Sequence, residues 1–261
     1  MRKTVLVFIS ILIAFLGGCS EQDSQGSLEK IEERGYIVLG LDDTFAPLGF
    51  RDENDEIVGF DIELAKRVAQ EMGVELRIQP IEWDSKLLEL NSGNIDMIWN
   101  GLTITEERQE NINFSAPYLS NRQIVLTNNS SILDLSDLEG LKVGVQIDSS
   151  GETALSSNEI ADKISETVRF NSFLEALLDL DSGRIDAIVI DEIMGRYVVS
   201  KGTYNCFVTD ISLGSESYGI GFRLDDSDLR DEIDSVLTKL SSEGVTAEIS
   251  EKWFGEDIFR K

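Results

Sequence analysis

The sequence lacks histidine altogether and contains only two cysteines, Cys19 and Cys206. Without histidine, the chain cannot form a Ser-His-Asp triad or a Cys-His catalytic pair. Two cysteines are also too few for the Cys/His zinc sites found in many proteins. This composition excludes several common classes of enzyme. It does not exclude an enzyme that uses carboxylates, or a calcium site built from oxygen atoms.

Basic residues are scarce as well. The chain has 23 Lys and Arg residues against 49 Asp and Glu residues, which gives a formal net charge of −26. A protein that binds nucleic acid needs a basic face to meet the phosphate backbone, so this balance argues against a nucleic-acid partner. We interpret the excess of acidic side chains as a solvated surface.

Long apolar runs are also rare. The run Val5–Leu16 has twelve residues, which is too short to cross a bilayer as a helix. It follows a basic N-terminus and leads into Leu16-Gly17-Gly18-Cys19, which resembles a bacterial lipobox. The resemblance implies that the chain is cut before Cys19 and that this cysteine is lipidated. We therefore expect a lipoprotein signal peptide at 1–18 and a lipid anchor site with a tether at 19–34.

Lipidation of Cys19 would hold the protein in the cell envelope, on the extracytoplasmic face of the membrane. Loss of residues 1–18, which carry two basic and no acidic side chains, would change the net charge from −26 to −28. Cys206 would then be the remaining free thiol, so no intrachain disulfide is expected. An ordinary secretory signal and an uncleaved anchor are the alternatives. The rest of the chain, about 240 residues, suits one large or two modest domains.

A repeat indicates how that chain is organised. The frame Leu-Glu-Leu-Asn-Ser-Gly-Asn-Ile-Asp at 88–96 recurs as Leu-Asp-Leu-Asp-Ser-Gly-Arg-Ile-Asp at 178–186. Two copies at this separation predict two similar α/β lobes rather than a solenoid. When the copies are aligned, Gly101 falls opposite Asp191, and both follow a predicted buried strand.

The stretch after the first copy suggests a binding site for an anionic group. Ile95–Trp99 is predicted to be a buried strand, and Thr105 is a candidate N-cap for a short helix that carries Arg108. In open α/β sheets, ligands bind beyond the carboxyl ends of the strands. A guanidinium at such an end matches a carboxylate or a phosphate. A surface helix with a solvated Arg108 is the alternative.

If Arg108 and Asp191 face one ligand, that ligand carries both a carboxylate and an ammonium group. A free α-amino acid is the smallest common molecule of this kind. A second polar loop, Gln146–Gly151, precedes a predicted helix and could present backbone N–H groups to an anion.

The other elements follow from periodicity and capping signals. We predict strands at Tyr36–Leu39, Val74–Ile81, Gln123–Leu126 and Tyr218–Phe222, a hairpin within Leu48–Val58, and helices at Leu28–Arg34, from Asp61 as N-cap to Gly73, at Lys86–Leu90, Phe173–Leu180 and Ser227–Leu240, and before Gly255.

Several motifs are similar to those of one known family. They are Phe45-Ala-Pro47, Gly59-Phe-Asp61, Gly101-Leu-Thr-Ile-Thr105-x-x-Arg108, Phe114-Ser-x-Pro-Tyr118 and Lys252-Trp-Phe254. In this order they resemble the solute-binding proteins of polar amino-acid ABC importers, family 3. The resemblance implies an α/β type II periplasmic-binding-protein fold, in which two α/β lobes joined by two hinge strands enclose a ligand cleft. We expect lobe 1 at 35–121 and 218–261, and lobe 2 at 122–217, with hinge strands at its two ends.

The resemblance also implies roles for individual residues. Arg108 would bind the ligand α-carboxylate and Asp191 the α-ammonium, with Thr103 and the backbone of Gly101 close to both groups. Phe45 and Trp83 would enclose the side chain of the ligand.

The remaining positions that the resemblance implies are polar. They are Asp42 near the side-chain end of the ligand, Asn100 where the family often has a small residue, and Gln146, Ser149 and Ser150 in a loop that helps to bind the carboxylate. Asp148 stands where the family usually has glycine, which leaves the carboxylate contacts of the second lobe open.

Taken together, we expect a receptor rather than an enzyme, without metal or cofactor. Its expected partners are a free L-amino acid, an ABC permease with its ATPase, and the membrane through the N-terminal lipid, and the receptor is expected to be a monomer. Asp42, Asp148 and Asp191 favour a basic or neutral polar ligand, and glutamine and cystine stay open. A dehydratase-like enzyme that uses Asp148 or Glu152, and a sensory ligand-binding module, are the alternatives.

Overall fold

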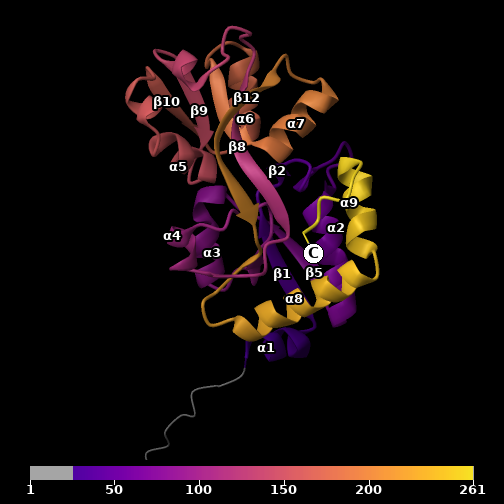
Figure 1. The fold of residues 1–261 in the computed structure, drawn as a ribbon. Helices are drawn as coiled ribbons and strands as arrows, with labels where there is room; N and C mark the ends of the chain where they lie inside the picture. Colours follow the sequence, from indigo (N-terminus) through magenta and orange to yellow (C-terminus); the bar gives the residue numbers. More distant parts are fainter. Residues whose placement is uncertain (1–25, 261) are drawn as a thin grey trace, which may run out of the picture.

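The computed structural model describes residues 26–260. The predicted signal peptide, Cys19 and the first part of the tether lie outside these residues. The described chain forms two α/β lobes, one above the other in Figure 1. None of the helices in residues 26–260 is long and apolar enough to span a membrane.

The first lobe contains a five-stranded sheet in the order β5-β1-β6-β13-β7. Strand β1 lies between β5 and β6 and is parallel to both, whereas β13 is antiparallel to its two neighbours. The strands are β1 (Tyr36–Leu41), β5 (Glu75–Pro80), β6 (Met97–Ile98), β7 (Asn113–Phe114) and β13 (Gly221–Phe222). A smaller sheet of β2 (Thr44–Phe45), β3 (Gly49–Arg51) and β4 (Ile57–Val58) contains the predicted hairpin.

The second lobe contains a sheet in the order β10-β9-β11-β8-β12. Strands β10, β9 and β11 run parallel, and β8 is antiparallel to both β11 and β12. The strands are β8 (Leu119–Thr127), β9 (Lys142–Gln146), β10 (Glu166–Phe170), β11 (Ala187–Asp191) and β12 (Phe207–Tyr218). The β8–β12 pair extends from this sheet toward the first lobe and joins the two (Figure 1). This is the predicted type II periplasmic-binding-protein fold.

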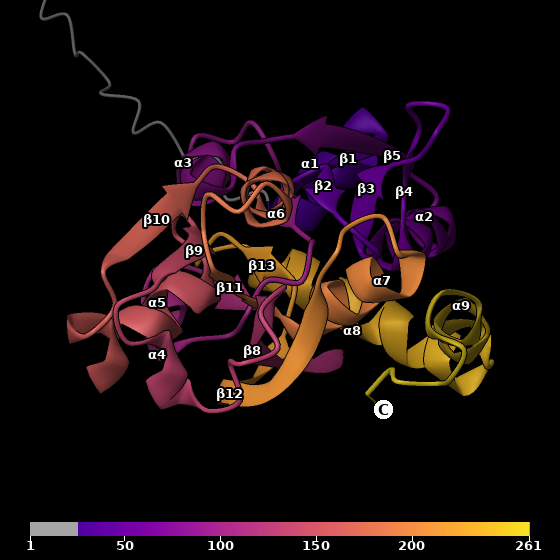
Figure 2. The same cartoon turned by 90° about the horizontal axis from the view of Figure 1, so that it is seen from above.

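Helices cover the sheets of both lobes. The second lobe has α5 (Ser150–Ser156), α6 (Phe173–Asp181) and α7 (Glu192–Lys201), and the first lobe has α1 (Ser27–Arg34), α2 (Phe60–Met72), α3 (Lys86–Asn91), α4 (Glu106–Gln109), α8 (Ser227–Ser242) and α9 (Val245–Phe254). Short 3-10 helices lie at Trp83–Ser85, Leu135–Leu138 and Glu159–Asp162. Seen from above (Figure 2), α9 lies on the side of the molecule opposite β10 and α5.

The last two helices return the chain to the first lobe, where α8 contacts α1, α2 and α9. Helix α8 has the predicted apolar face, and its five apolar residues on that face are buried. They are Leu229, Ile233, Val236, Leu237 and Leu240. Helix α9 ends at Gly255, whose φ of 79° suits a left-handed C-cap that glycine adopts without strain.

The two repeat copies occupy equivalent places in the two lobes. In the first, Asp96 accepts a hydrogen bond from the Val38 N–H of the neighbouring strand β1, at 2.7 Å. In the second, Asp186 accepts one from the Lys142 N–H of the neighbouring strand β9, at 2.8 Å. The repeated aspartate therefore ties its own segment to the adjacent strand in each lobe, which explains why both frames end in the same residue.

Three local predictions are wrong. Asp61 is not an N-cap, because α2 begins at Phe60 after Gly59, and the Asp61 side chain is fully buried instead. It accepts hydrogen bonds from the Gly101 N–H and the Tyr118 hydroxyl, both at 2.9 Å. The strand predicted at Ile95–Trp99 is shorter, since β6 spans two residues. The single strand predicted at Tyr218–Phe222 is divided, because Tyr218 ends β12 and β13 begins at Gly221.

Candidate functional site

All eleven residues predicted to bind ligand line one pocket between the lobes. The two lobes close over this pocket and leave about 10 Å³ of open space in it, which is about enough for one water molecule. Phe173, the first residue of α6, also lines this pocket and was not predicted.

The pocket residues come together because they follow the carboxyl ends of strands. Asp42 follows β1, Trp83 lies shortly after β5, and Gly101 shortly follows β6 in the first lobe. In the second lobe, Gln146 ends β9 and Asp191 ends β11. These strand ends face one another across the space between the two sheets, as expected for ligand sites in α/β folds.

Arg108 supplies the positive charge of the pocket. Thr105 caps α4 as predicted, since its hydroxyl accepts a hydrogen bond from the Arg108 N–H at 3.1 Å. The guanidinium donates from Nη1 to the Thr103 carbonyl at 3.0 Å and from Nη2 to the Asp148 carbonyl at 3.1 Å. Burial lowers the pKa of Arg108, while the nearby acids Asp148, Glu216 and Asp191 raise it. An arginine side chain stays charged under these conditions.

Asp191 is an acidic residue of lobe 2 that lines the same pocket. It is almost fully buried, and its Oδ1 accepts hydrogen bonds from Asn121 at 2.8 Å, Gln123 at 3.0 Å and the Tyr218 hydroxyl at 2.5 Å. Burial, followed by the nearby Glu216 carboxylate, raises the pKa of Asp191 well above its usual range.

The partners of Asp191 were not predicted from the sequence. Asn121 and Gln123 are two positions apart on β8, so their side chains point to the same face of the sheet. Glu216 lies directly opposite Asn121 on β12. The sequence signal that could have indicated these residues is the run of four polar residues, Ser120–Gln123, that precedes the apolar Ile124–Leu126 in the linking strand.

Asp42 lies at a second acidic position of the pocket. Its Oδ1 accepts hydrogen bonds from the Thr44 N–H at 2.9 Å and the Thr44 hydroxyl at 2.7 Å. Its Oδ2 accepts one from Gln146 Nε2 of the other lobe, at 2.7 Å. Burial raises the pKa of Asp42, and the hydrogen bonds from Thr44 and Gln146 lower it. Asn100 accepts a hydrogen bond from the Asp42 N–H, and its own Nδ2 has no partner among residues 26–260.

Aromatic side chains line the same pocket. Phe45 and Trp83 are 5% and 7% exposed, and both belong to lobe 1. Phe173 faces Phe45 from the other lobe, with 6.0 Å between the ring centroids. These rings give the site an apolar wall for the aliphatic or aromatic part of a ligand.

Gly101 adopts a conformation that favours glycine, with a φ of 62°. A Cβ at this position would come within 2.7 Å of Leu48 and 2.8 Å of Phe45. Its N–H donates to the buried Asp61 carboxylate at 2.9 Å. The Gly101 N–H is one of the backbone groups that were expected to face a ligand. It is hydrogen-bonded within the protein instead.

The two predicted serines differ in their contacts. Ser149 caps α5 by accepting a hydrogen bond from the Glu152 N–H, and its hydroxyl donates to the Gln146 carbonyl at 2.8 Å. Ser150 accepts a hydrogen bond from the Thr103 hydroxyl across the pocket, at 3.0 Å. Ser150 is therefore the serine whose hydroxyl faces the other lobe.

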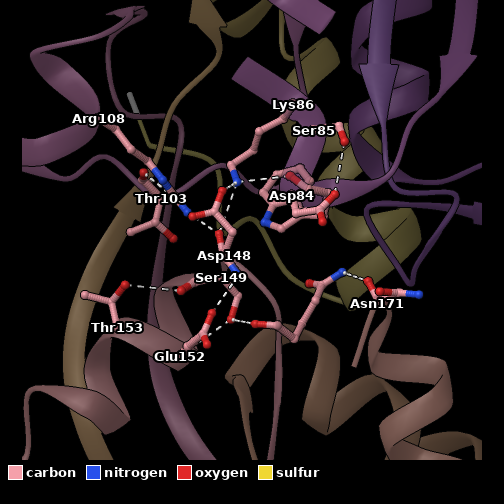
Figure 3. A network of polar contacts seen from close by, with 12 residues as sticks. Asp84, Ser85, Lys86, Thr103, Arg108, Asp148, Ser149, Glu152, Thr153 and Asn171 are labelled. Carbon is pink, nitrogen blue, oxygen red and sulfur yellow. Dashed lines mark hydrogen bonds and ion pairs between the residues drawn. The ribbon is translucent and has the colours of Figure 1, made fainter. Parts of the chain in front are cut away.

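Lys86 lies beside the pocket and was not predicted (Figure 3). It is 1% exposed, forms an ion pair with the Asp148 carboxylate, and donates to the carbonyls of Trp83 at 3.0 Å and Asp148 at 3.1 Å. Burial first, and the nearby Arg108 second, lower the pKa of Lys86 to about 8.

Asp148, where the family usually has glycine, has a φ of 56°. Aspartate tolerates this left-handed region better than most residues do. Its side chain reaches across to Lys86 of the other lobe (Figure 3). The departure from glycine thus adds an ion pair between the lobes.

The sequence profile of bacterial extracellular solute-binding proteins, family 3, matches residues 37–256. The chain belongs to this family. The family 3 match spans both lobes and includes all eleven predicted site residues.

Individual relatives of family 3 cover nearly the whole chain. The L-cystine-binding protein TcyJ of Escherichia coli K12 is 31% identical over 94% of this chain and 93% of its own length. The arginine-binding extracellular protein ArtP of Bacillus subtilis 168 is 30% identical over 97% of this chain and 98% of its own. A substrate-binding protein of an ABC uptake transporter from Streptococcus pneumoniae, solved with bound histidine, is 36% identical. It matches with a TM-score of 0.86 over 89% of this chain and 97% of its own.

Proposed function

We propose that this protein is the extracytoplasmic receptor of an ABC importer and binds a free L-amino acid with a basic or neutral polar side chain. The observation that carries the proposal is the presence of one half-buried guanidinium and one buried carboxyl group, Arg108 and Asp191, in a single pocket between two lobes. An α-amino acid carries the matching carboxylate and ammonium on one carbon atom. The relatives named above bind cystine, arginine and histidine by their names and titles.

In this proposal, Arg108 pairs with the α-carboxylate, with help from Thr103, Ser149 and Ser150 around it. Asp191 and the backbone of Gly101 hold the α-ammonium end. Phe45 and Trp83 pack against the side chain of the ligand, and Asp42, Asn100 and Gln146 meet its polar tip. The lobes are divided at the hinge strands, with lobe 1 at 35–121 and 218–261 and lobe 2 at 122–217.

The charges in and around the pocket support a basic or neutral polar ligand. Once Arg108 and Asp191 have paired with the ligand backbone, Asp42 is left as an acceptor at the side-chain end. A carboxylate on the ligand would meet Asp42 at close range, which is unfavourable between like charges. A guanidinium, ammonium or amide group can donate to Asp42 instead.

A receptor is favoured over an enzyme by the contacts of the two acids that an enzyme would need. Asp148 is in an ion pair with Lys86, and Glu152 is in one with Arg169 and accepts a hydrogen bond from the Asp148 N–H. A general acid or base has to reach its substrate, whereas both carboxylates are bonded to protein groups.

We also propose that the mature chain begins at Cys19, is anchored to the membrane by lipid there, works as a monomer with a permease and an ATPase, and requires no metal or cofactor. The lipobox-like Leu16-Gly17-Gly18-Cys19 supports the anchor. Mass spectrometry of the membrane fraction tests it, because lipidation adds the mass of a diacylglyceryl group to Cys19 and a Cys19→Ser variant lacks it.

A thermal-shift screen tests the proposed function. The Cys19→Ser mature protein is mixed with the twenty amino acids, cystine, ornithine, sugars and prephenate. A ligand at about a thousand times its Kd stabilises the folded state by roughly 4 kcal/mol, which for a chain of this size is on the order of ten degrees. A shift of this size with one or two basic or neutral polar L-amino acids is expected. A shift with a sugar or prephenate alone would refute the proposal.

A further inference from the structure

Asp191 has a second carboxylate beside it. Nδ2 of Asn121 donates to Asp191 Oδ1 at 2.8 Å and to Glu216 Oε1 at 2.6 Å. Nε2 of Gln123 donates to the same two oxygens, at 3.0 Å and 2.9 Å. Two acidic oxygen atoms that share two donor nitrogens lie close to each other.

The position of this pair follows from the sheet. Asp191 pairs with Gln123 in the β11–β8 register, and Glu216 pairs with Asn121 in the β8–β12 register. Residues opposite each other in a sheet present their side chains on the same face. Three adjacent strands therefore hold the two carboxylates and the two amides together, and β8 and β12 are also the strands that join the lobes.

The two carboxyl groups of this pair, Asp191 and Glu216, are hydrogen-bonded rather than ion-paired within residues 26–260. Among residues 26–260, neither Asp191 nor Glu216 forms a salt bridge, and their direct donors are amides and hydroxyl groups. Asp191 is buried and Glu216 is half-buried. Two carboxylates whose oxygen atoms share the same donors repel each other when both are ionised, and one proton held between them relieves this repulsion. The burial and the like charge that raise the pKa of Asp191 act in the same direction.

We infer that Asp191 and Glu216 share one proton when the pocket is empty, and that the ammonium group of an arriving amino acid displaces this proton into solvent. The inference rests on the proposed function. It makes Glu216 a positioning residue, which acts on the ligand through Asp191 and the shared amides. The charge balances, because one cationic group enters the site as one proton leaves.

Other charged or titratable groups face the pair from the surrounding elements. Tyr218 on β12 donates its hydroxyl to Asp191, and burial raises the pKa of this tyrosine well above its usual range, so it stays neutral. Arg108 on α4 lies near both acids and stays charged. Glu192, at the start of α7, is ion-paired with Arg122 and Arg196. None of these groups changes its charge between pH 5 and 8. Asp42, which lines the pocket, and Asp61, which is bonded to Gly101, also have raised pKa values, so the Glu216→Gln variant is needed to assign proton release to the pair.

The expected pH dependence has a definite sign. At low pH the empty pair holds its proton, and binding must expel it, so affinity falls as the pH falls. At high pH the pair has already lost the proton, and affinity becomes independent of pH. Below the pKa of the empty pair, Kd rises toward tenfold for each pH unit.

Isothermal titration calorimetry with L-arginine and L-glutamine tests the inference, because neither ligand titrates between pH 5 and 8. Each titration is run at the same pH in two buffers that differ in enthalpy of ionisation, phosphate and Tris above pH 7 and acetate and MES at lower pH. The difference in enthalpy gives the number of protons released. Glu216→Gln removes the shared proton and keeps a side chain of the same shape. Glu166→Gln, on the exposed Lys142–Glu166 ion pair of β10, is the matched control.

We expect the wild-type protein and Glu166→Gln to release up to one proton per ligand, with affinity that weakens at low pH. Glu216→Gln should bind with a flat pH profile and without proton release. Binding by the wild-type protein without proton release at any pH from 5 to 8 would overturn the inference and leave the proposed function intact. This result needs no variant, so a folding defect in Glu216→Gln does not affect it. Failure of every amino acid to bind would refute the proposed function itself.

Discussion

The Lys86 ammonium and the Asp148 carboxylate form an ion pair that joins the two lobes beside the pocket. Lys86 follows β5 in lobe 1, and Asp148 follows β9 in lobe 2. The carbonyl of Asp148 also accepts a hydrogen bond from Arg108 (Figure 3). One residue of lobe 2 thus contacts two cationic side chains of lobe 1, one of which is proposed to bind the ligand.

Replacement of Lys86 by Met should change how stability depends on pH. The pKa of this lysine is lowered by burial to about 8 in the folded protein, against 10.5 in the unfolded chain. Its contribution to stability is therefore fully present above pH 10.5 and is lost as the pH falls through about 8. The difference between the two pKa values corresponds to a change of up to about 3 kcal/mol in the free energy of unfolding. We expect the Tm of Lys86→Met, relative to wild type, to fall as the pH rises from 8 to 10.

Thermal unfolding of both proteins in the same buffers measures this difference, and titrations shared by the two proteins cancel. Lys239→Met, which removes an exposed lysine in an ion pair with Glu71, is the control and should follow the wild type. A constant difference between Lys86→Met and wild type over this range would contradict the assignment.

Asp61 provides a second pH-dependent prediction with the opposite sign. Burial raises its pKa from 3.8 to about 7. A carboxyl group with a raised folded-state pKa contributes stability that is fully present below pH 3.8 and is lost as the pH rises through about 7. This loss amounts to up to about 4 kcal/mol of the free energy of unfolding.

Asp61→Asn removes the titration and keeps an oxygen that can accept the Gly101 N–H. Relative to wild type, Asp61→Asn should therefore gain stability as the pH rises from 4 to 7, as measured by urea unfolding at several pH values. If the difference between the two proteins does not change with pH, Asp61 does not titrate in this range.

Substitution of Gly101 by alanine, with the same substitution at Gly93 as a control, tests how closely atoms pack around the pocket. Both have positive φ, 62° and 75°, but a Cβ at Gly93 would meet no atom within 4 Å, whereas one at Gly101 would meet Leu48 and Phe45 within 3 Å. Gly93→Ala should show the backbone cost alone, about 1 kcal/mol of stability. Gly101→Ala should cost more and should also weaken amino-acid binding, as measured by chemical unfolding and calorimetry. Equal effects of the two substitutions would mean that the close packing around Gly101 is unimportant.

Asp42 should determine preference for the ligand side chain. Asp42→Asn removes a buried negative charge and keeps the shape of the side chain. We expect it to weaken binding of L-arginine by about 1.5–3 kcal/mol, which is typical of a hydrogen bond to a charged group. Binding of L-glutamine should change by less than 1 kcal/mol. Competition between the two amino acids, measured by calorimetry, gives both values, and equal losses for the two ligands would place Asp42 away from the side-chain end.

Local patterns in the sequence predicted much of this fold. The apolar period of α8 and the glycines that end α2 and α9 were predicted correctly, because these signals act over a few residues. The pocket was predicted because ligand sites lie beyond the carboxyl ends of strands, and motifs shared with the family identified the individual side chains. All eleven predicted residues line the pocket, while their roles in binding stay proposals.

Contacts between distant segments could not be predicted in the same way. Glu216 meets Asn121 only through the register of β8 and β12, and Lys86 meets Asp148 only when the lobes are in contact. Asp61 has the residue type of a helix cap, but tertiary packing around Tyr118 and Gly101 directs its carboxylate inward. Register and lobe contact are properties of the folded chain, which propensity and spacing alone do not specify.

The central claim is that Arg108 and Asp191 recognise the two charged groups of a free amino acid. The most direct measurement is the affinity of the wild-type protein and Arg108→Ala for the amino acid that gives the largest thermal shift, and for the corresponding amine without the carboxylate. Loss of one partner of a buried charge pair costs about 2–5 kcal/mol. We predict that Arg108→Ala loses this amount for the amino acid and little for the amine, which the wild-type protein binds weakly. Wild-type affinity of Arg108→Ala for the amino acid would contradict the account.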